Sequence, residues 1–210
     1  PKNVTVTASN IADIDGVTIS GGLATGSGFQ VSVSGAVSLN TISGNATASL
    51  TDGSVLTLTG ALTVTATDQS HVAADGGGVA VGLSTGGSSS GSMGISVGIN
   101  TITNSTQAFI VNSDVNAAAG VSVLSETKAK KDEPTIDALV LAGGGGGSIG
   151  SGASVVPSAA GAYAKNHVAS TMKAYIDNTD QSTYEIRTSA NAISVSVVDE
   201  SSINADVVGA

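Results

Sequence analysis

The first residues in the chain that could do chemistry are two neighbouring carboxylates. Asp13 and Asp15, in the stretch Asp-Ile-Asp-Gly, match the opening of a calcium-binding loop, in which oxygen ligands recur at alternate positions. The glutamate that completes such a loop is missing, and so is the nonapeptide pattern of calcium-binding β-rolls. Because Asp-Gly is common turn chemistry, we expect a turn here and assign the chain no metal and no cofactor. A weak calcium ion near the two aspartates stays open.

Histidine offers the next candidate chemistry. The chain has two histidines, His71 and His167, at different places in the repeat described below. A zinc or catalytic site needs further ligands, and the sequence has no cysteine and no pair of histidines at helical spacing. We therefore expect both histidines on the surface, in turns.

Two glycine-rich runs, Gly86–Gly94 and Gly143–Gly152, could suggest loops that cradle a phosphate. Neither run ends in Lys-Ser or Lys-Thr, and neither has the strand-to-helix context of a P-loop. They fall at equivalent places in successive repeats, so we interpret them as flexible loops or as glycine-packed strands.

Positive charge is concentrated late in the chain. Two segments there, at about 126–137 and 177–189, lengthen one repeat, and loops that leave a regular repeat are where binding surfaces usually lie. A solvated loop of mixed charge is the plainer interpretation. If this region binds a partner, the residues we assign to the contact are Lys128, Lys130, Lys131, Tyr184 and Arg187.

Composition limits the function classes. Charged residues make up 11% of the 210 residues, against about a quarter in a typical soluble domain. The net charge of −9 argues against nucleic acid and anionic membranes as partners. The positive mean hydropathy of +0.29 argues against disorder. No apolar run reaches the roughly 18 residues of a transmembrane segment.

One sequence pattern occurs three times along the chain. Asn40, Asn100 and Asn166 each precede, by two positions, a β-branched apolar residue, and each is followed further on by alanine and then by Leu or Ile. A fixed period of about 60 residues is typical of a repeat architecture. Since asparagine suits turns and bonds neighbouring amides, we expect the motif at a structural corner of each unit. Stacked corners would let these side chains support one another.

Each repeat unit contains a segment in which apolar and polar residues alternate. Apolar residues alternate with Thr or Ser from Val4, Leu62, Val121 and Ile193 onward, which predicts strands with an apolar inner face and outward Thr and Ser. We divide the chain into repeat unit 1 (1–61), unit 2 (62–120), unit 3 with the two loop insertions (121–192), and the truncated start of unit 4 (193–210).

The predicted fold class is all-β, a parallel β-solenoid (β-helix) of ~60-residue repeats forming an extended rod. A β-sandwich of this length would bury several large aromatic residues between its sheets, whereas this chain has three Tyr, two Phe and no Trp. The short spacing of apolar pairs favours two or three coils per unit, and one broad coil per unit stays open.

The repeats resemble a known class of sequence. The pattern is carried by Asn100-Thr-Ile102, Thr106-Gln-Ala108-Phe-Ile110 and Val121-Ser-Val123, and again around Asn166. It is similar to repeats of very large secreted or surface-anchored bacterial proteins: haemagglutinin-like adhesins, autotransporter-type exoproteins and leukotoxin-like repeat proteins. The first unit departs from it, with Ala46 and Ser49 in place of Thr106 and Phe109. The resemblance implies an extracellular or cell-surface solenoid and transfers no catalytic residue.

The expected function is therefore a non-catalytic structural or adhesive module, a rigid stalk or a cell-surface or biofilm filament segment. Its partners would be neighbouring repeats or other copies end to end, with cell-surface or matrix glycans or proteins as further candidates. The alternative is a β-helical carbohydrate-binding or polysaccharide-degrading domain, which usually needs aromatic platforms and a carboxylate pair in a groove. An ice-binding surface would need a threonine ladder in every coil, and the strands at Val121 and Ile193 do not keep one.

Overall fold

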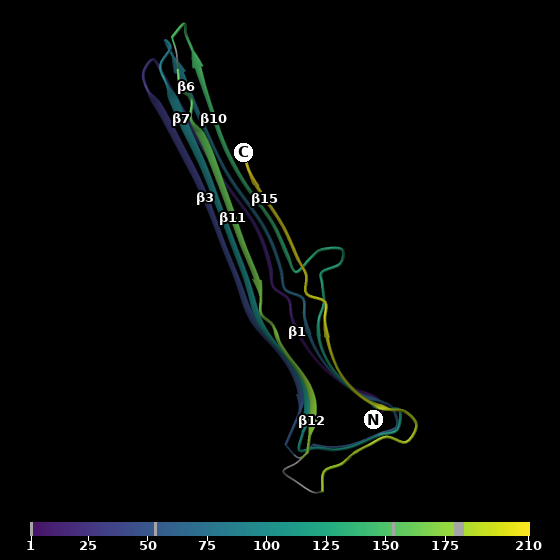
Figure 1. The fold of residues 1–210 in the computed structure, drawn as a ribbon. Coiled ribbons are helices and arrows are strands. Elements are labelled where there is room, and N and C mark those ends of the chain that lie inside the picture. The colour runs from purple at the N-terminus through teal and green to yellow at the C-terminus, as the bar shows by residue number, and fades with distance from the viewer. Residues whose placement is uncertain (1, 53, 153, 179–182) are drawn as a thin grey trace.

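The computed structural model describes residues 2–52, 54–152, 154–178 and 183–210. Within these ranges every regular element is a strand, and all the strand pairs are parallel, so the chain is a parallel β-solenoid (Figure 1). The described residues include no helix with the length and apolar character needed to cross a membrane.

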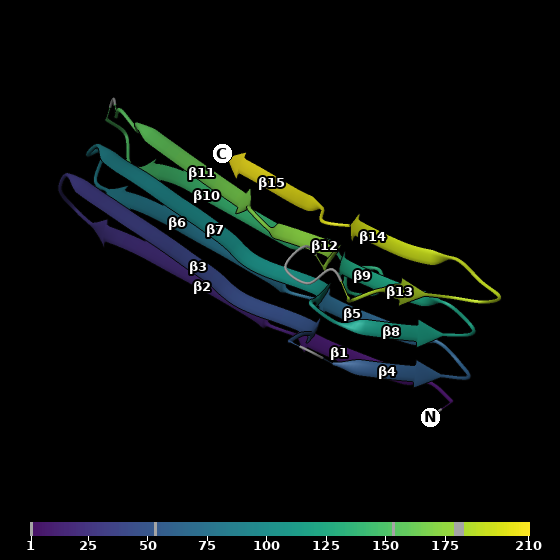
Figure 2. The ribbon, with the colours of Figure 1, turned by 90° about the horizontal axis from the view of Figure 1, so that it is seen from below.

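Four sheets run along the solenoid. Three of them take one strand from each successive coil in turn, and in the other the central strand β7 pairs with β3 on one side and with β11 and β12 on the other (Figure 2). In pairing order they contain β1 (Val4–Asn10), β5 (Leu62–Asp68), β9 (Val121–Thr127) and β14 (Ile193–Asp199); β2 (Asp13–Gly26), β6 (His71–Thr85), β10 (Ile136–Ile149) and β15 (Ile203–Gly209); β3 (Gln30–Leu50), β7 (Ser90–Val111), then β11 (Ser158–Val168) and β12 (Thr171–Asp177); and β4 (Val55–Leu58), β8 (Asp114–Ala117) and β13 (Ile186–Arg187).

Each coil is broad. β3 alone has 21 residues and β7 has 22, so about 60 residues go once around the axis. The expectation of two or three coils per unit is wrong, because the spacing of apolar pairs reflects successive stretches of very long strands. The long dimension of the molecule in Figure 1 is therefore the strand direction, and the coils stack across it.

The coil has two parts, which we call the base and the arm. The base is a triangular section formed by β1, β5, β9 and β14, by β4, β8 and β13, and by the carboxyl-terminal parts of β3, β7 and β12. The arm is a flat two-layer slab in which β2, β6, β10 and β15 face the amino-terminal parts of β3 and β7 and the strand β11.

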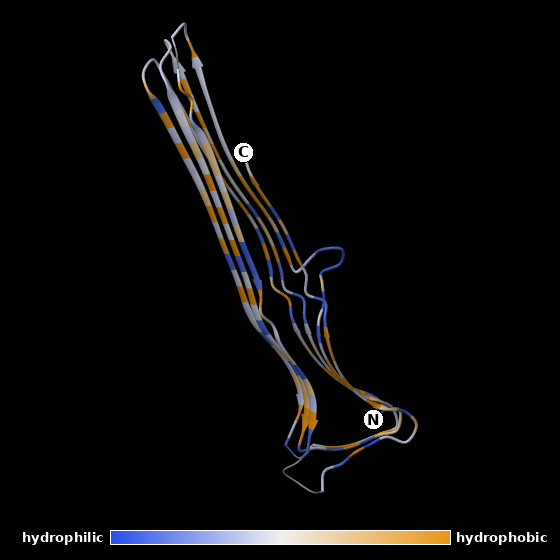
Figure 3. Ribbon diagram, in the orientation of Figure 1, coloured by the Kyte–Doolittle hydropathy of each residue, from blue (hydrophilic) through white to orange (hydrophobic). Residues whose placement is uncertain are grey.

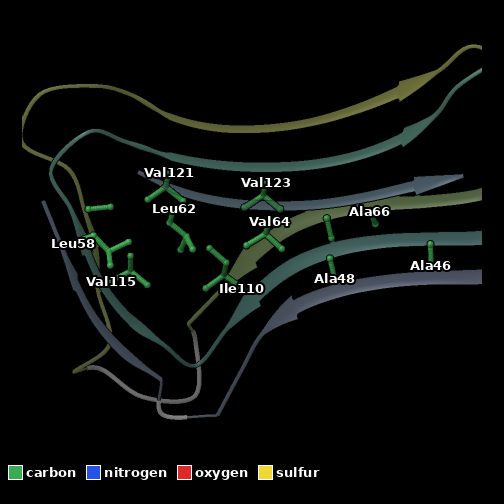
Figure 4. Packing of buried hydrophobic residues seen from close by; sticks show 12 residues of the cluster. Ala46, Ala48, Leu58, Leu62, Val64, Ala66, Ile110, Val115, Val121 and Val123 are labelled. Carbon is green, nitrogen blue, oxygen red and sulfur yellow. The ribbon is translucent and has the colours of Figure 1, made fainter. Parts of the chain in front are cut away.

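The base contains the main apolar core. Leu62, Val64 and Val123 from one sheet meet Ile110 and Val115 from the other two, and all five side chains are fully buried (Figure 4). Here the alternation follows the expectation, with apolar residues inward and Thr or Ser outward. At about 25 cal/mol per Å² of buried apolar surface, a core of this kind is the principal stabilising contribution.

In the arm the orientation of apolar and small residues is the reverse of that in the base. Its inward positions carry mainly Ser, Gly and Ala, while Val17, Ile19 and Leu23 on β2 and Val33 and Leu39 on β3 point outward and are more than half exposed. Figure 3 shows the resulting alternation of hydrophobic and hydrophilic residues along these strands. The prediction that Thr and Ser face outward is therefore wrong for the arm.

Close approach of the two layers explains the small inward residues. A Cβ on Gly94 would lie 2.1 Å from the carbonyl oxygen of Gly143, and a Cβ on Gly144 would lie 2.3 Å from that of Ala159. No side chain fits at such distances, so bulky residues can only point outward. The run of glycines from Gly143 belongs to β10, which supports glycine-packed strands over flexible loops for this run.

The recurrent asparagines lie inside long strands, and the prediction of a corner is wrong. Asn40 and Asn100 lie within β3 and β7, and Asn166 lies in β11. The amide of Asn40 donates to Asn100 Oδ1 over 2.8 Å, and that of Asn100 donates to Asn166 Oδ1 over 2.8 Å. An in-register parallel stack lets the central amide both donate and accept along one column, which satisfies the buried side chain of Asn100.

Candidate functional site

The densest group of ionisable side chains lies where the loop 128–135 meets the start of β2 and β6. Asp13 and Asp15 point outward from β2, and His71 is the register partner of Asp13 on β6. The loop adds Lys130 and Glu133 to the group. We call these five residues the loop cluster. The predicted turn at Asp13–Gly16 is wrong, because these residues form the first part of β2.

Ion pairs hold the loop on the sheet. Lys130 Nζ lies 2.8 Å from Asp13 Oδ2 and 3.0 Å from Glu133 Oε2. Hydrogen bonds to Asp13 and to Glu133 raise the pKa of the Lys130 ammonium above the ordinary range for lysine. The loop is therefore fastened at a point 117 residues away in the chain.

His71 is buried beneath the loop, so the prediction of a surface turn is wrong for it. Its Nδ1 lies 2.7 Å from the carbonyl oxygen of Pro134, and its Nε2 lies 3.4 Å from Glu133 Oε2. A carbonyl oxygen only accepts, so Nδ1 carries the hydrogen of this bond. The second histidine, His167, is exposed on β11, in a strand and not in a turn.

The cluster includes a set of metal-type donors. One ligand atom from each of Asp13, Asp15 and His71 lies within 4.8 Å of the others. A mixed carboxylate and imidazole set suits a transition metal better than calcium, which prefers oxygen. The ammonium of Lys130 already contacts Asp13, so the chain supplies its own cation at this position. The ion pairs of Lys130 with Asp13 and Glu133 hold the loop 128–135 against β2.

The structure separates the residues that the sequence assigned to a partner contact. Lys128 pairs with Glu126 over 2.7 Å, Lys130 belongs to the loop cluster, and Lys131 is exposed in the same loop. Arg187 pairs with Glu185, and Tyr184 is half-buried beside β13. The two groups flank opposite ends of β9 and β14, so about 20 Å separates them for seven strand residues. Residues 179–182 of the second extension lie outside the described ranges.

A buried polar network was missed from the sequence. Asp68 is 1% exposed and accepts hydrogen bonds from Asn10 over 2.7 Å, from Ser70 over 2.9 Å and from Asn104 over 2.8 Å. Neutral donors thus satisfy a buried carboxylate at the corner between β5 and β6. An alignment of the repeats could have indicated this network, because Asn10 and Asp68 occupy equivalent positions in successive coils.

Comparison with known proteins adds no family. No protein-family model, curated protein or solved structure matches the chain.

Proposed function

We propose that this chain is a non-catalytic structural segment of a large extracellular bacterial protein. In this proposal successive coils stack to form a filament or stalk at the cell surface. The repeat patterns around Asn100 and Asn166, which resemble those of large bacterial exoproteins, support this assignment.

The single observation that carries the proposal is the in-register stacking of whole coils. Asn40, Asn100 and Asn166 form one column, and the backbones of β3, β7 and β11 pair residue for residue beside them. Among the described residues, β1, β2, β3 and β4 each pair with a strand on one side only. A free edge of this kind is a template for another strand, so a further coil can continue the stack.

The breadth of the coil favours a ribbon-like filament segment over a thin stalk. Each coil of about 60 residues adds only about 4.8 Å along the axis, while a strand of 22 residues extends about 70 Å across it. A structure of this shape contributes little length and a large lateral surface.

Two experiments test the assignment. Antibodies against the purified chain should label intact cells of the organism that encodes it, and labelling only after permeabilisation would contradict an extracellular role. The carbohydrate alternative is tested by incubating the chain with a panel of polysaccharides and measuring new reducing ends. We expect no release above buffer. Release that is lost in the Asp13→Asn variant would support the alternative.

A further inference from the structure

Both outer sides of the arm are apolar, and we name them after their strands. Face A is the outward side of β2, β6 and β10, and face B is the outward side of β3, β7 and β11. Large side chains that are at least 38% exposed occur across each of them. On face A these include Val17, Ile19, Leu23, Val79, Leu83 and Leu141. On face B they include Val31, Val33, Val37, Leu39, Met93 and Ile95.

The arm is also free of formal charge over most of its length. No Asp, Glu, Lys or Arg occurs in residues 16–51, 76–113 or 138–164, whereas the base and the loop 128–135 carry most of the ionisable groups. A water-exposed surface normally carries interspersed charges of both signs. The charged residues of the two faces, among them Asp75 and Lys165, lie at the end of the arm next to the base, and the rest of each face has the composition of a buried surface.

Parallel sheets are normally covered on both sides, and their strands carry apolar residues toward both coverings. In the arm the inner side is filled by small residues of the opposite layer, while the larger apolar residues point away from it. Contiguous apolar patches beyond a few hundred Å² mark interaction surfaces. The described residues of the chain leave both faces uncovered, so each face requires a covering from a partner.

Each face has a groove and neighbouring ridges that a second protein surface of complementary shape can contact. On face A, Gly77 is the register partner of Ile19 and Leu141, and a groove of about 320 Å³ at this position is bordered by Val17, Val79 and the exposed Asp75. On face B a groove of about 310 Å³ lies over Gly91, bordered by Val31 and Pro157. Each groove lies beside ridges of aliphatic side chains, so two arms can interlock ridge into groove.

The area available for association of copies grows with the number of stacked coils. Ten residues by three strands give a footprint of about 30 by 14 Å, or roughly 400 Å² per face and about 850 Å² when two copies meet. A stable interface buries about 1,200–2,000 Å² in total. One contact between two single chains therefore falls below this range. Each further coil of a stack adds about 30 by 4.8 Å to each face, so a contact between stacks of about five coils reaches it.

We propose that a second copy of this chain packs on each apolar face, so that arms laminate side by side about 10 Å apart. The proposal deepens the structural function above, because it adds lateral association to stacking along the axis. A lipid bilayer is the less suitable occupant. The unpaired backbone groups of the strands at the edges of the stack would find no partner in hydrocarbon.

Single-cysteine variants test the contact directly, because the chain has no cysteine of its own. Val79→Cys places a thiol on face A and Val33→Cys places one on face B. Val55→Cys is the matched control, since Val55 is 69% exposed but belongs to the base. After oxidation at about 50 μM we expect at least five-fold more disulfide-linked dimer for the arm variants, alone or mixed, than for the control. Equal cross-linking of all three variants would overturn the proposal.

A charged variant and a lipid assay separate the outcomes. Leu141→Lys adds charge to face A and should shift the protein toward monomers in light scattering, with an unchanged circular-dichroism spectrum. A wild-type chain that remains monomeric would overturn the proposal in favour of no occupant. A wild-type chain that floats with phosphatidylcholine vesicles, while the two arm cysteine variants remain uncross-linked, would overturn it in favour of lipid. End-to-end association without cross-linking of the arm would also overturn it, while leaving the proposed filament function intact. Absent surface labelling would instead contradict the extracellular role.

Discussion

The side-chain amide of Asn40 donates to Oδ1 of Asn100 across 2.8 Å, although 60 residues separate the two in the chain. Asn100 makes the same bond to Asn166, 66 residues further on. A side chain that is 0% exposed thus has its amide hydrogen and its oxygen both paired by identical residues of the neighbouring coils. Each coil fixes the register of the next.

Replacing the central residue of this column should weaken the fold. Asn100→Ala leaves the amide of Asn40 and the oxygen of Asn166 without their partner, so we expect a loss of about 1–3 kcal/mol in the free energy of unfolding. Urea denaturation measures it. Asn116→Ala, at an exposed position of β8, is the control and should change the stability by less than about 0.5 kcal/mol. Equal effects would show that the ladder contributes nothing specific.

Neighbouring glycines in the same run should respond in opposite ways. A Cβ on Gly144 meets the backbone oxygen of Ala159, whereas a Cβ on Gly145 has no atom within 4 Å. We expect Gly144→Ala to destabilise by about 1–3 kcal/mol or more, since backbone must move. Gly145→Ala should be neutral within about 0.5 kcal/mol. Thermal unfolding of both variants measures the two changes in stability. A Gly144→Ala variant as stable as wild type would contradict the close packing of the layers.

Valine should matter in the base and be dispensable in the arm. Val64 is fully buried, so Val64→Ala removes core contacts and should cost about 2 kcal/mol. Val79 is 50% exposed, so Val79→Ala should leave the free energy of unfolding of dilute protein within about 0.5 kcal/mol of wild type. If denaturation midpoints ranked the two variants the other way, the inward and outward assignments in the arm would be reversed.

The fastening of the loop 128–135 should persist into alkaline solution. The folded-state pKa of Lys130 is raised by Asp13 and Glu133, so its contribution to stability is complete below the unfolded value of about 10.4 and disappears as pH rises through the folded value. The melting temperatures of wild type and Lys130→Met should therefore differ by a constant amount from pH 7 to about pH 10 and converge above it. Convergence already below pH 9 would exclude this ion pair as the cause.

The fold class could be predicted from the sequence because its signals are local. Alternation from Val4, Leu62 and Val121 identifies strands, and the recurrence of the Asn motif identifies coils that stack in register. The number of coils per unit could not be obtained in this way. Alternation continues through the whole of β7, so no turn signal marks where one face of the coil ends.

The orientation of the arm and the loop cluster depended on distant parts of the chain. A strand such as Val31-Ser-Val33-Ser reads equally well with valine inward, and only the narrow space beside glycines such as Gly94 decides that valine faces out. Likewise, Lys130 meets Asp13 only after two coils have stacked. Neither relation has a signature in a short window of sequence.

The asparagine column also gives the solenoid a direction. Each amide nitrogen points toward the next coil and each amide oxygen toward the previous one, so the side-chain dipoles of Asn40, Asn100 and Asn166 add instead of cancelling. The first coil presents an oxygen at its end of the column and the third coil presents a nitrogen. Two like ends brought together would oppose oxygen to oxygen or nitrogen to nitrogen. Stacking can therefore continue only head to tail, which makes any filament of these coils polar, with two chemically distinct ends.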